Sequence, residues 1–324
     1  MKTFQETLAL VNKAIADMPF DRQPQGLYAP VKYVLSLGGK RIRPVLMLMA
    51  YNLYRDDIET IMPTALGIET YHNYTLLHDD LMDRAEVRRG QPCVHKKWND
   101  NTAILSGDSM LVLAYQLMAQ ARPQYLKEVM DLFTETALEI GEGQQYDMEF
   151  ESRDDVVAEE YIEMIRLKTS VLLACALKIG AIQADAATED ADRLYRFGEQ
   201  LGLAFQLQDD LLDVYGDFAV FGKKIGGDIL CNKKTYMLIQ ALNHASPAQR
   251  QELGYWLQVA QPDPQQKVAA VTALYNVIGV RAMAEVQINH YFDEALKSLD
   301  EVALPAERKQ PLRLFALSLL NRQS

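Results

Sequence analysis

Acidic side chains gather at two places in the chain, each time as two adjacent aspartates followed by a third. The six residues are Asp79, Asp80 and Asp83 in HDDLMD, and Asp209, Asp210 and Asp213 in FQLQDDLLD. Leucines flank or interrupt both runs, so we expect each run on a helix that also packs against apolar neighbours. Residues four apart on a helix share one face, about 6 Å apart along the axis. The carboxylates of each run should therefore crowd together, and Gln206 extends the polar stripe of the second run.

Carboxylates this close need a partner that offsets their repulsion. Two like charges 4 Å apart repel by about 4 kcal/mol at an effective dielectric constant near 20, and apolar surroundings add to the cost. A single run of this kind is typical of a solvated helix face, but two runs in apolar helices favour bound divalent cations. Oxygen ligands without histidine or cysteine at metal spacing suit Mg²⁺ or Mn²⁺, and Mg²⁺ commonly completes its coordination with water and substrate phosphate.

Small basic islands accompany the acidic runs in a chain whose net charge is −11. They are Lys40, Arg41 and Arg43 in GGKRIRP, Arg88 and Arg89 in RRG, Lys168 beside Thr169, and Lys223, Lys224, Lys233 and Lys234 within and after GKKIGGD. Any one of them could be ordinary surface charge. Together with the acidic runs they indicate phosphate recognition, because arginine offers paired donors and lysine a point charge to phosphate oxygens. We therefore expect metal ions and a diphosphate between the acids and the arginines.

The helical period dominates the whole chain, and no alternation typical of strands stands out. The segments SPAQ (246–249) and DP (263–264) have the spacing of helix starts, and Gly180 and Gly279 are expected to end helices. Residues 124–246 contain no proline, so they can hold long helices, because an interior proline costs about 3 kcal/mol. We predict one all-α domain over residues 1–324, with a division near residue 245 as the alternative.

Composition narrows the classes of function. The chain has 324 residues, 49% of them hydrophobic, and a sequence pI of about 5.0. It can bury a large core, and it lacks the net basic face that nucleic-acid backbones require. Cys93, Cys175 and Cys231 are scattered and odd in number, which argues against a disulfide framework or a zinc site and favours a cytoplasmic protein. We expect no leader peptide and no membrane span of about 18 apolar residues.

The ordered series GGKRIRP, HDDLMD, RRG, GQQYD, KT, FQLQDDLLD and GKKIGGD resembles the trans-isoprenyl diphosphate synthases of the polyprenyl synthetase family, from about residue 36 to about residue 236. The resemblance implies an all-α bundle of the isoprenoid-synthase type around a deep central cavity, assembled as a homodimer. It implies a prenyltransferase of isoprenoid biosynthesis that condenses isopentenyl diphosphate head-to-tail with dimethylallyl, geranyl or farnesyl diphosphate. It also implies three Mg²⁺ in each active site.

The resemblance assigns roles to individual residues. The implied metal ligands are Asp79, Asp83 and Asp209, which with Arg88 and Lys168 would carry the catalysis. The implied contacts to the allylic diphosphate are Arg88, Lys168, Thr169, Gln206, Lys223 and Lys233, with Lys223 favoured over Lys224 because it directly follows the glycine. The implied contacts to isopentenyl diphosphate are Lys40, Arg43, His72 and Arg89. The residues that would orient the metal ligands without binding the metal themselves are Gln144, Asp147, Asp80 and Asp213.

Diphosphate is a poor leaving group until its charge is neutralised. The metal ions with Arg88 and Lys168 would stabilise the departing diphosphate, which favours ionisation to an allylic cation. The double bond of isopentenyl diphosphate then attacks, and in the family the departed diphosphate can take the proton whose loss completes the product. Thr169 and Gln206 would help to shield the cation. No serine–histidine–aspartate set, reactive cysteine or glycine-rich nucleotide loop offers a competing chemistry.

In the family, a bulky residue five positions before the first aspartate can limit chain elongation. Tyr74 holds that position, with Thr75 beside it and Tyr71 nearly one turn earlier, although both tyrosines would by default be core aromatics. The first acidic run also lacks the two-residue insertion of many bacterial farnesyl diphosphate synthases. The resemblance therefore implies a short-chain synthase that makes geranylgeranyl (C20) or farnesyl (C15) diphosphate, with Tyr74 limiting the length.

Three alternatives stay open at this stage. A terpene cyclase or head-to-head prenyl synthase would share the fold but lack the isopentenyl diphosphate contacts. A phosphohydrolase, prompted by His78-Asp79, would need additional histidine ligands, and the second acidic run has none. A non-catalytic partner subunit would usually have lost an aspartate run. The sequence leaves product length, allylic primer, pathway and the role of residues after about 245 undecided.

Overall fold

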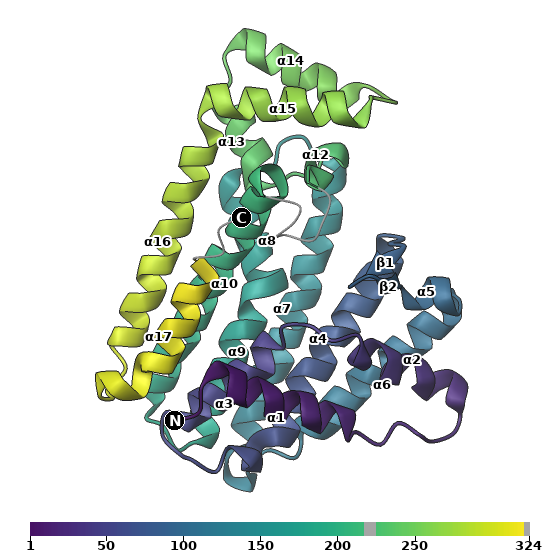
Figure 1. Cartoon of the computed structure of the whole chain (residues 1–324). Coiled ribbons are helices and arrows are strands. Elements are labelled where there is room, and N and C mark those ends of the chain that lie inside the picture. The colour runs from purple at the N-terminus through teal and green to yellow at the C-terminus, as the bar shows by residue number, and fades with distance from the viewer. Residues whose placement is uncertain (217–224, 321–324) are drawn as a thin grey trace. The chain divides into compact units, whose positions relative to one another are not determined.

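The computed structural model describes residues 1–216 and 225–320 (Figure 1). Helices form nearly all of its regular structure, and the strands it describes are two short ones that pair as an antiparallel hairpin. The all-α prediction is thus confirmed. The described residues form two compact units. Unit 1 comprises residues 1–135, 175–195 and 302–312, and unit 2 comprises residues 136–174, 196–216, 225–301 and 313–320. The interpretation as one domain stays a prediction.

Unit 1 is built on two long helices that lie side by side, α4 and α6 (Figure 1). Its elements are α1 (Phe4–Ala16), α2 (Gln25–Ser36), α3 (Ile42–Asn52), η1 (Ile58–Ile61), α4 (Met62–Met82), β1 (Val87–Arg88), β2 (Gln91–Pro92), α5 (Val94–Lys97), α6 (Asp100–Met118) and η2 (Pro123–Tyr125). Apolar side chains from α2, α4, α5 and α6, such as Val31, Leu77, Val94 and Met110, pack into one buried cluster. This packing fixes the end of α4 that carries the first acidic run.

Unit 2 holds the second acidic run. Four helices contribute residues to both units: α7 (Leu126–Ser152), α9 (Val171–Gln183), α10 (Thr188–Tyr215) and α17 (Ala306–Leu320). The elements of unit 2 alone are α8 (Ala158–Ile165), η3 (Arg166–Ser170), α12 (Gly227–Leu230), α13 (Tyr236–His244), α14 (Pro247–Gln258), α15 (Pro264–Ile278) and α16 (Val280–Asp300). Its core joins side chains such as Phe150, Tyr161, Leu207, Met237 and Ile288. The proline-free interval therefore holds the two longest helices described, α7 and α10, as predicted.

The predicted helix ends are confirmed at three of four positions. Ser246 and Asp263 accept hydrogen bonds from the backbone N–H three residues later, and Gly279 ends α15 with a φ of 86°. The prediction for Gly180 was wrong, because α9 continues to Gln183. Gly180 instead permits a close approach, since a Cβ there would lie 2.2 Å from the backbone oxygen of Met47. The small hairpin was also missed, because strands of two residues leave no alternating pattern.

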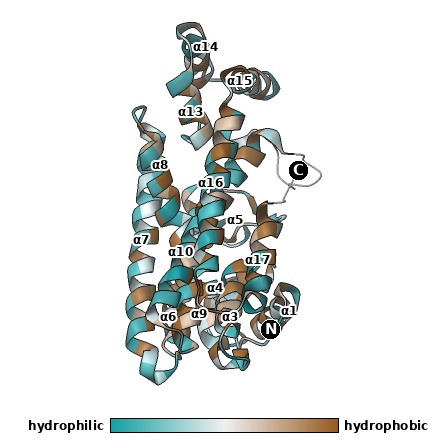
Figure 2. Cartoon of the chain, turned by 90° about the vertical axis from the view of Figure 1, so that its left-hand side faces the viewer, coloured by the Kyte–Doolittle hydropathy of each residue, from teal (hydrophilic) through white to brown (hydrophobic). Residues whose placement is uncertain are grey.

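Single helices carry both polar and apolar residues. Figure 2 shows hydrophilic and hydrophobic colours along the same helix, for example on α7 and α16, as expected of amphipathic helices that pack on one side. Within the described ranges, no single helix has the length and apolar character needed to cross a membrane, and two bent helix pairs meet that test only by length and composition.

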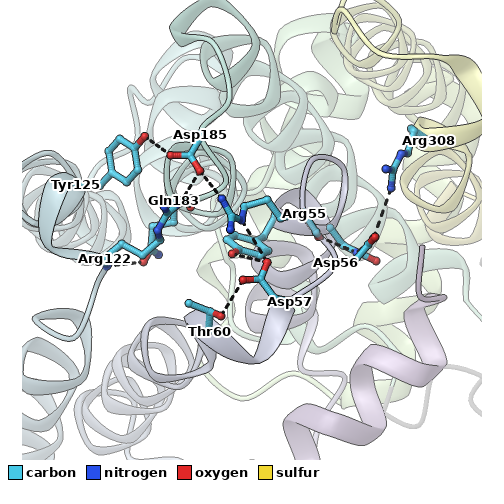
Figure 3. Close-up of polar contacts among 11 residues, drawn as sticks. Arg55, Asp56, Asp57, Thr60, Arg122, Tyr125, Gln183, Asp185 and Arg308 are labelled. Atoms are coloured by element: carbon cyan, nitrogen blue, oxygen red, sulfur yellow. Dashed lines mark hydrogen bonds and ion pairs between the residues drawn. The ribbon is translucent and has the colours of Figure 1, made fainter.

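A polar network joins three loops of unit 1 (Figure 3). At its centre is Asp185, which follows α9 with a left-handed φ of 64°. Its carboxylate accepts hydrogen bonds from Tyr125 at 2.5 Å, from Arg122 at 2.7 Å and from Arg55 at 2.8 Å. The Tyr125 hydroxyl first, and then Arg122, lower the pKa of Asp185 to about 2. Arg55 also reaches Asp57 at 3.2 Å, so the network ties the loop after α3 to both other loops.

Candidate active site

The first acidic run lies at the carboxyl end of α4. Asp79 and Asp80 belong to its last turn, and Asp83 is the C-cap, whose N–H donates to the Asp79 carbonyl at 2.9 Å. Asp80 is buried, whereas the Asp79 side chain is 21% exposed and Asp83 is exposed. The two predicted metal ligands of this run are therefore accessible and one turn apart, as their spacing indicated.

Arg88 contacts the first acidic run directly. It lies in β1, and the turn after it contains Arg89 and Gly90 with φ values of 53° and 74°, which is the pattern of a two-residue type I′ hairpin. Arg88 Nε lies 2.8 Å from both carboxylate oxygens of Asp80, and Nη2 lies 3.6 Å from Asp79 Oδ2. Asp80 therefore orients Arg88 by direct contact. The metal ions and the diphosphate expected between these acids and the arginines stay a prediction.

Three of the predicted contacts to isopentenyl diphosphate lie together in unit 1. Arg43 Nη1 lies 3.1 Å from His72 Nε2. Because a guanidinium only donates, that ring nitrogen accepts, and the proton of neutral His72 lies on Nδ1. Burial, followed by the charges of Arg43 and Arg89, holds the pKa of His72 well below its usual range. His72 is therefore neutral at pH 7, and it orients Arg43.

The turn before α3 brings the remaining contact to this cluster. Gly38 and Gly39 both have positive φ, 76° and 128°, and the Gly38 carbonyl accepts a hydrogen bond from Arg89 Nη1. Lys40 follows on the same turn and is exposed. The GGKRIRP and RRG motifs, 51 residues apart at this hydrogen bond, thus meet in the fold.

A buried carboxylate beneath these cations was missed by sequence reasoning. Glu69 Oε1 accepts from Arg41 Nη1 at 2.6 Å and from Asn73 Nδ2 at 2.8 Å, and the Glu69 and Arg41 side chains are each 2% exposed. Burial lowers the pKa of Arg43 to about 10, and the Glu69 charge opposes that shift. The signal was present in the sequence, because Glu69 is the only charged residue between Met62 and Leu77 on a helix with apolar neighbours.

The GQQYD and KT motifs meet in unit 2. Lys168 and Thr169 lie in η3, a π-helical turn between α8 and α9, and such turns are frequent at functional sites. Lys168 Nζ lies 2.6 Å from Asp147 Oδ2 on α7. Gly143 allows this approach, because a Cβ there would lie 2.3 Å from the Lys168 backbone nitrogen. Burial opposes ionisation of Asp147, but Lys233 and Lys168 outweigh it and hold its pKa below the usual range.

The second acidic run lies on α10, with one aspartate buried and the other two partly exposed. Asp210 is buried, and Asp209, Gln206 and Asp213 are half-buried. Asp210 accepts hydrogen bonds from the Tyr161 hydroxyl and from Gln206 Nε2, the latter at 3.3 Å. Burial raises the pKa of Asp210 to about 7, while the Tyr161 hydrogen bond opposes that shift. Sequence reasoning missed Tyr161, because a tyrosine in an amphipathic helix carries no sign of its partner.

Asp213 accepts hydrogen bonds from the backbone at the start of α12. Its Oδ2 accepts the Asp228 N–H at 3.0 Å, and its carbonyl accepts the Gly226 N–H at 2.6 Å. The N–H of Lys233, an exposed residue, donates to the Asp228 carbonyl at 2.9 Å. Lys223 and Lys224 lie outside the described residues, so the choice between them stays a prediction.

Tyr74, the residue predicted to limit product length, lies half-buried on α4. Its ring centroid is 5.5 Å from that of Tyr71 and 4.9 Å from that of His78. Tyr71 is buried against Phe133, so it is a core aromatic, and the Thr75 hydroxyl donates to the His72 carbonyl at 2.8 Å. Tyr74 is therefore the more accessible of the two tyrosines.

The donor set of the acidic runs fits an open magnesium site. Across the described ranges, no three His, Cys, Asp or Glu side chains are grouped so that they could enclose a metal ion. Mg²⁺ does not require such a cage, because it commonly takes one or two carboxylates and keeps water and phosphate as its other ligands. Asp79 and Asp83, accessible and one turn apart, offer that arrangement.

Comparison with known proteins gives one consistent family. The family model described as "Polyprenyl synthetase" matches residues 24–276. A geranylgeranyl diphosphate synthase from Methanosarcina mazei is 40% identical over 233 residues, 71% of this chain and 72% of its own length. A crystal structure of a geranylgeranyl pyrophosphate synthase superimposes with a TM-score of 0.95 at 40% identity over 100% of both chains. Another, from Corynebacterium glutamicum, is complexed with isoprenyl diphosphate and magnesium and has a TM-score of 0.84 at 28% identity, over 99% of this chain and 98% of its own.

Proposed function

Because this chain belongs to the polyprenyl synthetase family, we propose that it joins isopentenyl diphosphate head-to-tail to an allylic diphosphate and makes a short-chain prenyl diphosphate. The observation that carries the proposal is the cluster of Arg43, His72 and Arg89, which come from three separate segments of the chain. A terpene cyclase acts on one diphosphate and has no use for a second cationic set. The cluster therefore supports a reaction with two diphosphate substrates.

We assign the allylic diphosphate to the acidic runs and the cations beside them. Asp79, Asp83 and Asp209 would hold Mg²⁺, three ions in each active site with Mn²⁺ as a substitute, which when bound neutralises charge on the departing diphosphate. Residues that would donate to this diphosphate are Arg88, Lys168, Thr169, Gln206, Lys223 and Lys233. Asp80, Asp147, Asp213 and Gln144 would orient these donors and ligands. Contacts such as Arg88 to Asp80 and Lys168 to Asp147 support this division of roles.

We assign isopentenyl diphosphate to Lys40, Arg43, His72 and Arg89. Arginine and lysine would donate to the phosphate oxygens, and neutral His72 would hold Arg43 in place through Nε2 while offering its Nδ1–H. The pKa shift of His72 supports this role, since a protonated ring could not accept from Arg43.

Tyr74 is the residue that we propose to limit product length. A half-buried aromatic five positions before Asp79 supports geranylgeranyl or farnesyl diphosphate as the product.

Large apolar side chains remain exposed on α6, with Leu105 60% and Val112 68% exposed, which supports a homodimer whose second copy covers them. A cytoplasmic location is proposed from the scattered cysteines alone.

One assay separates the proposal from its competitors. The protein is incubated with Mg²⁺, isopentenyl diphosphate and, in turn, dimethylallyl, geranyl or farnesyl diphosphate, and diphosphate release and product length are measured. We expect diphosphate release that requires isopentenyl diphosphate, with a product at least one five-carbon unit longer than the primer. Diphosphate release from farnesyl diphosphate alone would instead indicate a cyclase, inorganic phosphate a phosphohydrolase, and no turnover with any allylic primer a non-catalytic subunit.

A further inference from the structure

A buried tyrosine lies against the second acidic run without a role in the chemistry described so far. Tyr161 on α8 donates its hydroxyl hydrogen bond to Asp210 Oδ2 on α10, and the two residues are 1% and 5% exposed. The other carboxylate oxygen, Oδ1, accepts from Gln206 Nε2 at 3.3 Å. Each oxygen of Asp210 is thus engaged by a different side chain.

The direction of these hydrogen bonds is fixed by chemistry. Burial first, and then the neighbouring Asp210 charge, hold the pKa of Tyr161 well above its usual range. Its hydroxyl therefore keeps its proton and donates. Without that donor the Asp210 carboxylate could rotate, because the last torsion of an aspartate side chain has a broad, shallow profile. Tyr161 therefore fixes the plane of the carboxylate.

Fixing Asp210 also fixes Gln206. The two residues are four apart on α10 and share a face, so their side chains meet directly. Above the Asp210 pKa of about 7, the ionised carboxylate presents Oδ1 to the Gln206 amide, so the NH₂ group must point toward it and the amide oxygen away. The amide cannot flip without losing this hydrogen bond, which makes its orientation depend on the carboxylate plane.

We propose that Tyr161 is a positioning residue: its hydroxyl fixes the Asp210 carboxylate and, through it, the Gln206 amide that contacts the allylic diphosphate. The proposal rests on the function proposed above. Tyr161 belongs to the buried core of unit 2 and Asp210 is buried beside it, whereas Gln206 is half-buried. The hydrogen bonds therefore lead from the rigid core to a side chain that substrate can reach, which is how precise sites are supported.

The first test is Tyr161→Phe, which removes the hydroxyl and keeps the ring. We expect kcat/KM for the allylic diphosphate to fall about tenfold, as for one lost oriented hydrogen bond, while KM for isopentenyl diphosphate stays within about twofold. The matched control is Tyr54→Phe, which removes another tyrosine–aspartate hydrogen bond, to Asp190 at 3.3 Å in unit 1. The control should lower the melting temperature without changing either substrate's kinetics.

A double-mutant cycle then tests whether the effect passes through Gln206. In a Gln206→Ala background, Tyr161→Phe should cause no further loss of kcat/KM for the allylic diphosphate, because the amide that it positions is absent. Additive losses, an equal effect on both substrates, or unchanged kinetics in Tyr161→Phe would overturn the proposal.

Asp210→Asn keeps the test decisive if Tyr161→Phe fails to fold. An asparagine could still accept from Tyr161 but would present NH₂ to Gln206, so the Gln206 amide should flip and the allylic kcat/KM should again fall selectively. Loss for both substrates alike would overturn the proposal. If the wild-type protein transfers no prenyl group to isopentenyl diphosphate, the proposed function fails. If it is active and these variants lack the selective effect, only the role of Tyr161 fails.

Discussion

Replacing Glu69 with glutamine should destabilise unit 1 strongly. Glu69 and Arg41 form an ion pair of 2.6 Å in which both side chains are 2% exposed, so solvent screens it little. Removing one charge from a buried pair typically costs about 3–5 kcal/mol, because the other charge stays buried without compensation. Glu69 Oε2 and Arg41 Nε find no hydrogen-bond partner among the described residues, so the ion pair is incompletely hydrogen-bonded. We therefore place the cost of breaking it at the lower end of this range, about 3 kcal/mol.

Thermal unfolding measures this cost. In a protein of 150–250 residues, 1 kcal/mol shifts the melting temperature by about 2–4 °C, and in a longer chain by less. A cost of about 3 kcal/mol should therefore make Glu69→Gln melt on the order of 5 °C below the wild type. The variant should also raise KM for isopentenyl diphosphate, because Arg41 is the N-cap of α3, lies between Lys40 and Arg43 in the sequence, and has a left-handed φ of 47°.

The double variant Arg41→Met/Glu69→Met provides the control. Replacing both charges with apolar side chains leaves no buried charge, and such replacements are often neutral or stabilising. We expect the double variant to recover most of the melting temperature that Glu69→Gln loses. A Glu69→Gln protein that melts within 1 °C of the wild type, or a double variant less stable than the single one, would refute the reasoning.

Three further predictions follow from single sites. Asp185→Asn should lower the free energy of unfolding by about 1 kcal/mol at pH 6, discounted because the carboxylate is 41% exposed. The lowered pKa stabilises the fold above about pH 4 and ceases to do so as pH falls toward 2, so urea titrations should show the difference shrinking between pH 4 and pH 2; a constant difference would contradict it. Gly180→Ala should lower the melting temperature, because its Cβ would meet the Met47 backbone, whereas Gly254→Ala, with open space around it, should raise it; equal shifts would contradict this. Tyr74→Ala should lengthen the products seen by chromatography, and an unchanged product distribution would reject its role.

Much of the local geometry of the candidate site could be predicted from the sequence, because residues close in the chain form its parts. The aspartate runs, the GGKRIRP turn and the Lys168-Thr169 pair are each contained within a few residues, so their spacing already states which side chains share a face or a turn. The all-α fold followed from helical periodicity and from caps such as Ser246 and Asp263, which act within four residues.

The parts that could not be predicted depend on partners far along the chain. Tyr161 and Asp210 are 49 residues apart, and Arg41 and Glu69 are 28 residues apart, so no local pattern joins them. Gly180 resembled a helix end, but its role is to admit the backbone of Met47 from another helix. Tertiary packing decided these cases, and sequence periodicity does not report it.

The central claim is that both aspartate runs act in one prenyl transfer. Its most direct test is the rate at which Asp79→Ala and Asp209→Ala proteins condense isopentenyl diphosphate with an allylic diphosphate in Mg²⁺, with the exposed Asp131→Ala as the control. We predict that each of the first two loses about 10²-fold or more in kcat, while the control keeps the wild-type rate. A wild-type rate in either Asp79→Ala or Asp209→Ala would contradict the account.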